Sequence, residues 1–324
     1  MTDSRPKTLL AMGADTAARL ITAPVRDRLL AVADIDPDLV ATDFADPAVA
    51  EALAEAEVLL TSWWCPPITA EVLAAAPRLR AIVHAAGSVK HHVTEACWER
   101  GLLVSSAAAA NAEPVAEYTL AAILFANKRV LDSARLYRER PGTRPDLDTL
   151  FPGFGNYRRT VGVIGASRIG RRVIELLRPF ELEVLVADPY LKEDLGVAHV
   201  ELDELFERSD VVTVHAPDLP ETRHLVSAAR LARMRDGATL INTARGALVD
   251  QDALIAELTS GRLYAVIDVT DPDPLPAARP CTTCRTSCSP RTSRARSAAS
   301  WPASPTWPWT SWPGTRAGCR SPTG

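Results

Sequence analysis

The stretch between residues 160 and 188 constrains the fold of this chain more than any other. An apolar, β-branched run that starts at Thr160 breaks at Gly165, a helical pattern opens at Arg168, and a second apolar run ends on Asp188. This order of strand, glycine turn, helix, strand and acidic residue is the layout of a βαβ unit that binds a dinucleotide. A purely structural strand–turn–helix is the alternative for the glycine pattern alone, but the strand context and the position of the acidic residue favour a binding unit.

The residues of this unit have separate physical roles. Gly165 permits the tight turn out of the strand, and Gly170 lets the helix, whose first N–H groups would face a pyrophosphate, pack closely on the sheet. Ser167 replaces the middle glycine of the pattern, so a phosphate would approach less closely there. Asp188 can accept hydrogen bonds from a ribose diol and would repel a 2′-phosphate, which favours NAD over NADP. The predicted cofactor contacts of this unit are Gly165, Ser167, Arg168, Ile169, Gly170 and Asp188.

Length and charge exclude several classes of protein. At 324 residues the chain is long enough for two domains with cores of their own. Its formal net charge of −4 gives no support to nucleic-acid binding. The polar N-terminus lacks the apolar core of a signal peptide, and no apolar run reaches the length of a membrane span. We therefore expect a cytoplasmic protein without nucleic-acid or membrane partners.

Short apolar runs alternate with helical patterns in the first third of the chain, which predicts an α/β unit with a parallel sheet. Gly87 and Ser88 follow one strand, where backbone N–H groups could bind an anion or simply form a tight turn. Trp63, Trp64 and Cys65 follow another strand and could line a pocket or belong to the core. The expected strands are 7–12, 58–61, 79–84 and 102–105, and the expected helices are 24–33, 48–56, 69–76 and 93–100.

The rest of the chain continues this alternation. A long helix is expected at 111–128, and an irregular segment with prolines and glycines at 131–159. A loop of this length usually packs against something, such as a partner subunit. Each later strand–helix repeat adds a strand to a doubly wound sheet. The expected strands are 210–215, 238–242 and 264–268, and the expected helices are 201–208, 227–234 and 251–259.

Polar residues follow two of these later strands. In an open α/β sheet, ligands lie beyond the carboxyl ends of the strands. Arg245 follows one strand and could bind a carboxylate through its planar guanidinium, or pair with Asp250 on the surface. His215 follows the other strand and precedes a proline, and we expect it to be structural rather than catalytic.

Three motifs carry a resemblance to a known family. They are the glycine turn at 165–170, the run at 205–217 together with Thr222, and the run at 234–250, which ends in Ile-Asn-Thr-Ala-Arg-Gly-Ala-Leu-Val-Asp. Over residues 55–276 the chain resembles the D-isomer-specific 2-hydroxyacid dehydrogenases. The resemblance implies two flavodoxin-like or Rossmann-like domains, each a doubly wound parallel sheet, with the active site in the cleft between them. The implied divisions are a substrate domain at 1–107, an NAD-binding domain at 108–276 and a tail at 277–324.

The same resemblance implies a chemistry and its contacts. The reaction would be hydride transfer between NAD(H) and a small 2-hydroxy or 2-oxo acid, without a metal, in a homodimer joined through the NAD-binding domain. Gly87 and Ser88 match residues that bind the substrate carboxylate through main-chain N–H groups, although Val89 replaces a second glycine of the family. Arg245 matches the arginine that holds the substrate carboxylate and carbonyl. Further cofactor contacts are implied for His215, Ala216, Pro217, Thr222, Thr243, Ala244 and Asp268.

The proton transfer of the family uses a histidine whose pKa a neighbouring glutamate raises. Asp273 falls at the glutamate position, with a side chain one methylene shorter. The histidine should follow in a Pro-His-Ile-Ala-Gly segment, but all six histidines of the chain precede Asp273. The resemblance therefore implies an NAD-dependent oxidoreductase with impaired activity or, as the alternative, a catalytically inactive NAD-binding protein.

The tail at 277–324 departs from the composition of a globular domain. It contains no Leu, Ile, Val, Met, Asp, Glu, Lys or His. Without aliphatic residues it cannot supply the helix that closes the substrate domain in the family, so we expect a disordered or non-native tail. Its Cys281, Cys284 and Cys288 could be read as metal ligands, but no fourth ligand has a suitable spacing, and we expect no metal.

A slip of the reading frame near residue 277 accounts for this composition. GC-rich codons for Leu-Thr-Pro-His-Ile-Ala-Gly, read one base later, encode Ser-Pro-Arg-Thr-Ser-Arg-Ala, which is the sequence at 289–295. The lost histidine would then straddle Arg291 and Thr292. Reading the gene across residues 270–296 tests this hypothesis, and a correct gene without Pro-His-Ile coding in the neighbouring frame would refute it.

Overall fold

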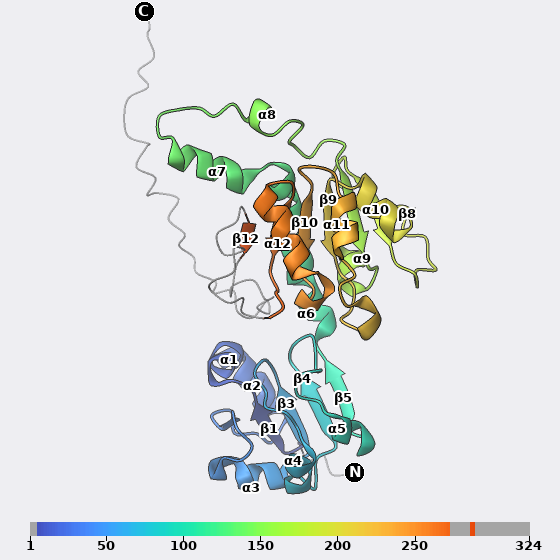
Figure 1. The fold of residues 1–324 in the computed structure, drawn as a ribbon. Helices are drawn as coiled ribbons and strands as arrows, with labels where there is room; N and C mark the ends of the chain where they lie inside the picture. The colour runs from blue at the N-terminus through green and yellow to red at the C-terminus, as the bar shows by residue number, and fades with distance from the viewer. Residues whose placement is uncertain (1–4, 273–285, 289–324) are drawn as a thin grey trace, which may run out of the picture.

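Two parallel sheets organise the chain into two lobes (Figure 1). The computed structural model describes residues 5–272 and 286–288. Within these residues, the small lobe has a five-stranded sheet in the order β2-β1-β3-β4-β5, and the large lobe has a seven-stranded sheet in the order β12-β11-β10-β9-β6-β7-β8. The neighbouring strands of both sheets run parallel. The predicted α/β class with two parallel sheets is therefore confirmed.

The small lobe is built from short apolar strands that alternate with helices, as the sequence pattern predicts. Its strands are β1 (Thr8–Ala11), β2 (Val40–Ala41), β3 (Val58–Thr61), β4 (Ala81–His84) and β5 (Leu103–Ser106). Its helices are α1 (Ala14–Leu20), α2 (Ala23–Val32), α3 (Pro47–Glu55), α4 (Ala70–Ala75) and α5 (Glu95–Glu99). Two hydrophobic clusters, one on each face of the sheet, bury residues such as Leu59 and Leu10. The sequence pattern did not predict α1 or the two-residue strand β2.

The large lobe is doubly wound about its first strand. Its strands are β6 (Thr160–Ile164), β7 (Glu183–Ala187), β8 (Ala198–His199), β9 (Val211–Val214), β10 (Thr239–Asn242), β11 (Tyr264–Ile267) and β12 (Thr286–Cys288). Its helices are α9 (Arg168–Leu177), α10 (Leu202–Arg208), α11 (Ala228–Arg233) and α12 (Gln251–Ser260), with 3₁₀ turns η1 (Pro220–Thr222) and η2 (Gly246–Leu248). The chain proceeds from β6 to β7 and β8 on one side, then crosses to β9 on the other. The switch point where ligands bind in such sheets therefore lies at the carboxyl ends of β6 and β9.

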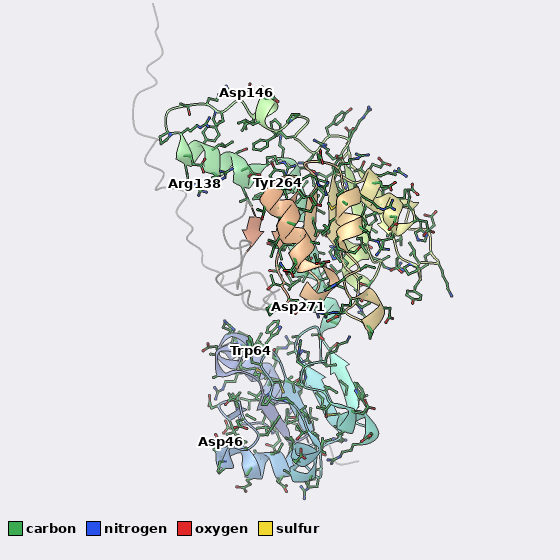
Figure 2. All side chains as sticks on the ribbon, in the orientation of Figure 1. Asp46, Trp64, Arg138, Asp146, Tyr264 and Asp271 are labelled. Carbon is green, nitrogen blue, oxygen red and sulfur yellow. The ribbon has the colours of Figure 1, made fainter. Side chains whose placement is uncertain are left out.

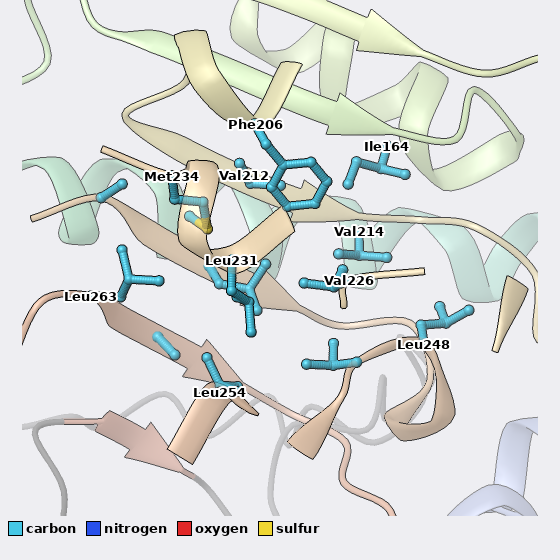
Figure 3. Close-up of a cluster of buried hydrophobic side chains, with 14 of the residues drawn as sticks. Ile164, Phe206, Val212, Val214, Val226, Leu231, Met234, Leu248, Leu254 and Leu263 are labelled. Atoms are coloured by element: carbon cyan, nitrogen blue, oxygen red, sulfur yellow. The ribbon is translucent and has the colours of Figure 1, made fainter. Parts of the chain in front are cut away.

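The core of the large lobe covers both faces of its sheet. One cluster packs Phe206 of α10 against Val212 and Val214 of β9 and against Leu231 of α11 (Figure 3). A second cluster covers the opposite face, where α6 (Ala108–Asn127) packs on α9, β9 and β10, and α9 packs on β6. The helix α6 begins at the junction of the two lobes, so it links the small sheet to the core of the large one (Figure 1).

The segment at 131–159 is less irregular than its sequence predicts. It contains α7 (Val130–Glu139) and the short α8 (Leu147–Leu150). The prediction was wrong for α7 because the prolines and glycines of the segment begin only at Pro141. Within α7, Arg135 pairs with Glu139 one turn later and with Asp132 one turn earlier, which supports the helix.

Several predictions about the end of the chain concern residues that the structure does not describe. Asp273, the proposed frame slip and most of the tail lie outside the described residues. The expectation was of a disordered or non-native tail, and of this tail the structure describes only Thr286–Cys288, which form β12 and pair with β11. In the described part of the chain, no helix is both long and apolar enough to cross a membrane.

Candidate active site

The glycine turn between β6 and α9 packs directly on the end of β9. Gly165 has a φ of +89°, and a Cβ there would lie 2.9 Å from the backbone of His215 and Ala216. A Cβ on Gly170 would lie 1.9 Å from the carbonyl oxygen of Gly165. Because neither position can take a side chain without moving backbone, both require glycine. The turn therefore packs closely against the end of β9, at the switch point of the sheet.

Two polar side chains hold this turn in place. Ser167 Oγ donates a hydrogen bond to the carbonyl of His215 at 3.3 Å. Asp188, which follows β7, accepts the N–H of Ala166 at 2.7 Å and that of Tyr190 at 2.8 Å, one on each carboxylate oxygen. Since a carboxylate oxygen has two lone pairs, Asp188 keeps acceptor capacity for a ribose beside the turn.

The first residues of α9 follow this turn. Arg168 is exposed and Ile169 is half-buried. The first N–H groups of a helix have no partner within the helix and carry its positive dipole end, which suits a pyrophosphate. The turn, the helix start and Asp188 together fit the adenosine and pyrophosphate portions of a dinucleotide such as NAD.

His215 and Thr222, both predicted near the cofactor, have partners within the fold. The ring of His215 is buried with Nε2 3.0 Å from Thr213 Oγ1, and burial lowers its pKa to about 3. The hydroxyl of Thr222 donates to the carbonyl of Pro217 at 2.6 Å and accepts the N–H of Leu219 at 2.9 Å. Both side chains shape the loop that follows β9, so the main chain of residues 215–217 is what borders the glycine turn.

The end of β10 presents Arg245 at the carboxyl edge of the sheet. The buried Asn242 accepts the N–H of Ala244 at 3.0 Å and donates to the carbonyl of Arg245 at 2.8 Å, which closes the turn after the strand. Thr243 Oγ1 lies 3.0 Å from Thr119 Oγ1 on α6. These contacts fix the backbone of the turn, while the side chain of Arg245 is exposed.

Asp250, the surface partner considered for this arginine, has a different role. It caps α12 by accepting the N–H of Ala253 at 3.1 Å. Such a cap satisfies one of the N–H groups that the first turn of a helix leaves unpaired.

On the small lobe, two buried histidines anchor the loop that contains Gly87 and Ser88. Thr61 Oγ1 lies 2.9 Å from Nδ1 of His84 and 3.2 Å from Nε2 of His92. The two rings lie 4.6 Å apart, and burial lowers the pKa of each to about 4. Residues 85–91 are thus held at both ends by one hydroxyl at the end of β3.

A cavity of about 510 Å³ lies between the two lobes. Figure 2 marks its surroundings with Trp64 on the small lobe and Asp271 on the large lobe. The volume is in the range of pockets for small ligands. Of the residues predicted from sequence, its walls contain the substrate residues Gly87, Ser88 and Arg245 and the cofactor residues Thr243, Ala244 and Asp268. Its walls do not include the glycine turn, Asp188, residues 215–217 or Thr222, which lie at the switch point of the large sheet.

The structure adds residues that the sequence patterns did not single out as site residues. Asn111, in the first turns of α6, lines the cavity, and a Cβ on Gly87 would lie 3.0 Å from its Nδ2. Within the described residues, its buried Oδ1 has no hydrogen-bond partner. The sequence signal that could have identified Asn111 was its position as a lone asparagine at the start of an expected helix. The other added wall residues are His91, Val115, Asp218, Arg223, Gly246, Ala247, Val269, Thr270 and Asp271.

The three residues after β3, which could line a pocket or belong to the core, have different environments in the structure. Trp63 lines the cavity. Trp64 is 74% exposed and has a φ of +65°, and Cys65 is buried in the core of the small lobe. One of the three is therefore a pocket residue and another a core residue.

Comparison with known proteins identifies the family. Residues 120–289, more than half of the chain, match the model of the D-isomer specific 2-hydroxyacid dehydrogenase NAD binding domain. The chain belongs to the D-isomer specific 2-hydroxyacid dehydrogenase family. It therefore carries the NAD-binding domain of this family, in agreement with the glycine turn and Asp188.

Similarity to individual members of the family extends beyond this domain. A glyoxylate reductase of Korarchaeum cryptofilum is 36% identical over 68% of this chain and 68% of its own length. A D-3-phosphoglycerate dehydrogenase of Mycobacterium bovis is 33% identical over 86% of this chain but 48% of its own length, so this chain spans about half of that relative. The structure of D-lactate dehydrogenase from Aquifex aeolicus, complexed with NAD and lactic acid, matches with a TM-score of 0.67 and 29% identity, over 85% of this chain and 80% of that one.

Proposed function

We propose that this chain is an NAD-dependent oxidoreductase that transfers a hydride between NAD(H) and a small 2-hydroxy or 2-oxo acid. The cavity between the lobes is the observation that carries this proposal. Gly87, Ser88 and Arg245 all belong to its walls. Backbone N–H groups and a planar guanidinium are both suited to a carboxylate. The family membership supplies the cofactor, and the named relatives act on small acids of this kind.

Each wall of the cavity has a separate task in this reaction. Gly87 and Ser88 hold the carboxylate of the acid from the small lobe, and Arg245 binds the carboxylate and polarises the carbonyl from the large lobe. Bound NAD(H) supplies or accepts the hydride. Asp188 and the start of α9 hold the far end of the cofactor. Asp273, which lies outside the described residues, is proposed to assist proton transfer through its carboxylate.

A second candidate function is NAD binding without catalysis. The observation that favours it is in the sequence, where no histidine follows His224. The proton donor that the family places near the end of the chain is therefore missing. Loss of a general acid costs ~10²–10⁴ in rate. This candidate keeps the cofactor site and the cavity but predicts no turnover.

Paired binding and turnover assays separate the two candidates. We expect the full chain to bind NADH more tightly than NADPH, because the Asp188 carboxylate repels a 2′-phosphate. We also expect slow NADH oxidation with glyoxylate or hydroxypyruvate. NADH binding without any oxidation supports the inactive protein instead. Absence of NADH binding contradicts both candidates, and tighter binding of NADPH than of NADH contradicts the role of Asp188.

We also propose that two copies of the chain associate through the large lobe. Phe125 on α6 is 52% exposed and Leu131 on α7 is 51% exposed, and both line an apolar depression of about 550 Å³. The segment that contains α7 and α8 extends beyond the sheet as an arm (Figure 1). Exposed apolar side chains beside such an arm suit a second copy of the chain, because contiguous exposed apolar patches mark interaction sites.

Sedimentation velocity tests this association. We expect a dimer at micromolar concentration for the wild-type chain. The double variant Phe125→Asp and Leu131→Asp should be monomeric, because each carboxylate would be buried without a partner in the interface. Trp98→Ser on α5 of the small lobe, which removes another exposed apolar residue, is the matched control and should remain dimeric. A monomeric wild-type chain contradicts the proposal.

A further inference from the structure

We propose that His91 is the group that gives and takes the proton in the hydride-transfer reaction of this chain. The inference rests on the proposed function, because it concerns the proton of that same reaction. His91 lies in the wall of the cavity between the lobes, together with Ser88 and Arg245. It is exposed, so its imidazole can exchange protons with water. Imidazole is the side chain that most often serves as general acid and base near neutral pH.

Burial excludes three of the other histidines from this role. The rings of His84, His92 and His215 are buried. Burial lowers the pKa to about 4 for His84 and His92 and to about 3 for His215. These rings are therefore neutral at physiological pH and have no imidazolium proton to give to a carbonyl oxygen.

The position of the last two histidines excludes them as well. His199 on β8 lies with its Nε2 3.1 Å from the carbonyl of Asp188, on the outer edge of the large sheet. The N–H of His224 donates to the carbonyl of Ala247 at 2.9 Å. Neither residue is in the wall of the cavity, whereas His91 is.

Both neighbours of His91 hold its backbone at the junction of the lobes. Lys90 Nζ donates to the carbonyl of Asp218 at 2.8 Å, which joins this loop of the small lobe to the loop after β9. His92 is fixed from the other side by Thr61, and its carbonyl accepts the N–H of Ile68 at 2.8 Å. A catalytic group needs such fixed placement, because small displacements of a reacting group cost large factors in rate.

The loop around His91 thus contacts the large lobe through Lys90, and charged groups of the large lobe line the cavity that it borders. Arg223 and Asp271 pair with each other at 3.2 Å on the large-lobe side. The charged residues on the loop of His91 and in the cavity walls are Lys90, Asp218, Arg223, Arg245, Asp268 and Asp271.

The proton step balances with groups that the proposed function already requires. In reduction, the carbonyl carbon of the oxo acid receives the hydride from NADH, and its π electron pair moves to the oxygen. The oxygen takes a proton from the imidazolium of His91, which gives the hydroxy acid, NAD⁺ and a neutral imidazole. Water then returns a proton to the exposed ring. In oxidation, the neutral imidazole removes the hydroxyl proton as the hydride leaves.

Kinetics of His91 variants test this assignment in the full chain. We expect His91→Gln to lower kcat for NADH oxidation by hydroxypyruvate by ~10²–10⁴-fold. The affinity for NADH, measured by its fluorescence, should stay within about twofold, because the glycine turn and Asp188, which are proposed to hold the far end of the cofactor, lie outside the walls of the cavity. The pH dependence that the wild-type rate owes to this proton transfer should disappear in the variant. Added imidazole should partly restore the rate of His91→Ala, because the cavity is open.

The control is His224→Asn, which removes an exposed histidine outside the cavity at a position with φ of +51°, a conformation that asparagine tolerates. It should keep the wild-type rate and pH profile. An unchanged rate in His91→Gln overturns the inference. A lost rate in His91→Ala that added imidazole does not restore overturns it as well. A wild-type chain that binds NADH but does not oxidise it also overturns the role of His91 and leaves the inactive NAD-binding function. A chain that does not bind NADH overturns the proposed function itself.

Discussion

Replacing Gly170 by alanine is expected to destabilise the large lobe by about 3 kcal/mol. In a helix, this change would otherwise stabilise by up to ~1 kcal/mol, because alanine is the better helix former. Here the new Cβ would lie 1.9 Å from the carbonyl oxygen of Gly165. The start of α9 must then move away from the glycine turn. Urea denaturation of the variant and the wild-type chain measures the difference.

The same displacement should weaken NADH binding. The first turn of α9 and the turn at Gly165 form one surface for the pyrophosphate. A shift of about 1 Å at such a site costs ~10²-fold in function, and we expect a loss of this size in NADH affinity. Fluorescence titration of NADH tests it.

Gly196→Ala is the matched control for Gly170→Ala. Gly196 has a φ of +70°, and no atom lies within 4 Å of a Cβ built there. The control therefore reports the cost of a left-handed conformation alone, about 1 kcal/mol, with no change in NADH affinity. If Gly170→Ala were as stable as the wild-type chain and bound NADH equally well, the close packing of α9 on the turn would be refuted.

Replacing Arg245 by glutamine should abolish most of the affinity for the acid. The expected loss is ~10–10²-fold, since hydrogen bonds between charged groups contribute about 1.5–3 kcal/mol. The affinity of Arg245→Lys for the acid should lie between those of the wild-type chain and Arg245→Gln, because lysine keeps the charge but loses the bidentate geometry. Binding of oxamate, an unreactive isostere of a 2-oxo acid, to the NADH complex is the measurement. It does not depend on turnover, so it also applies if the chain is inactive.

Arg223→Gln is the matched control for Arg245→Gln. Both arginines line the cavity, but Arg223 forms an exposed ion pair with Asp271. Exposed ion pairs contribute little, so its loss should change oxamate affinity by no more than about threefold. An effect of Arg223→Gln equal to that of Arg245→Gln would contradict the assigned substrate contact.

The sequence determined the local structure of the large lobe because its signals act over short distances. The β-branched run at 160–164, the glycine at 165 and the apolar period of α9 depend on near neighbours. The structural roles of Gly165 and Gly170 could also be predicted from sequence, since a tight turn and close packing allow no other residue. It failed for α7, where glycines and prolines late in the segment masked ten helical residues. The predicted division at residue 107 stays a prediction, although β5 ends at Ser106 and α6 begins at Ala108.

Only the tertiary structure decided which residues share the cavity. Gly87 and Arg245 are far apart in the chain, and their meeting depends on how two separate sheets pack. The adjacent His91 and His92 show the limit of local patterns most directly. Their residue type is the same, yet His92 is buried beside Thr61 while His91 is exposed in the cavity. The difference arises because the contact of Lys90 with Asp218 and the packing of β3 against this loop come from distant parts of the chain, which no local period encodes.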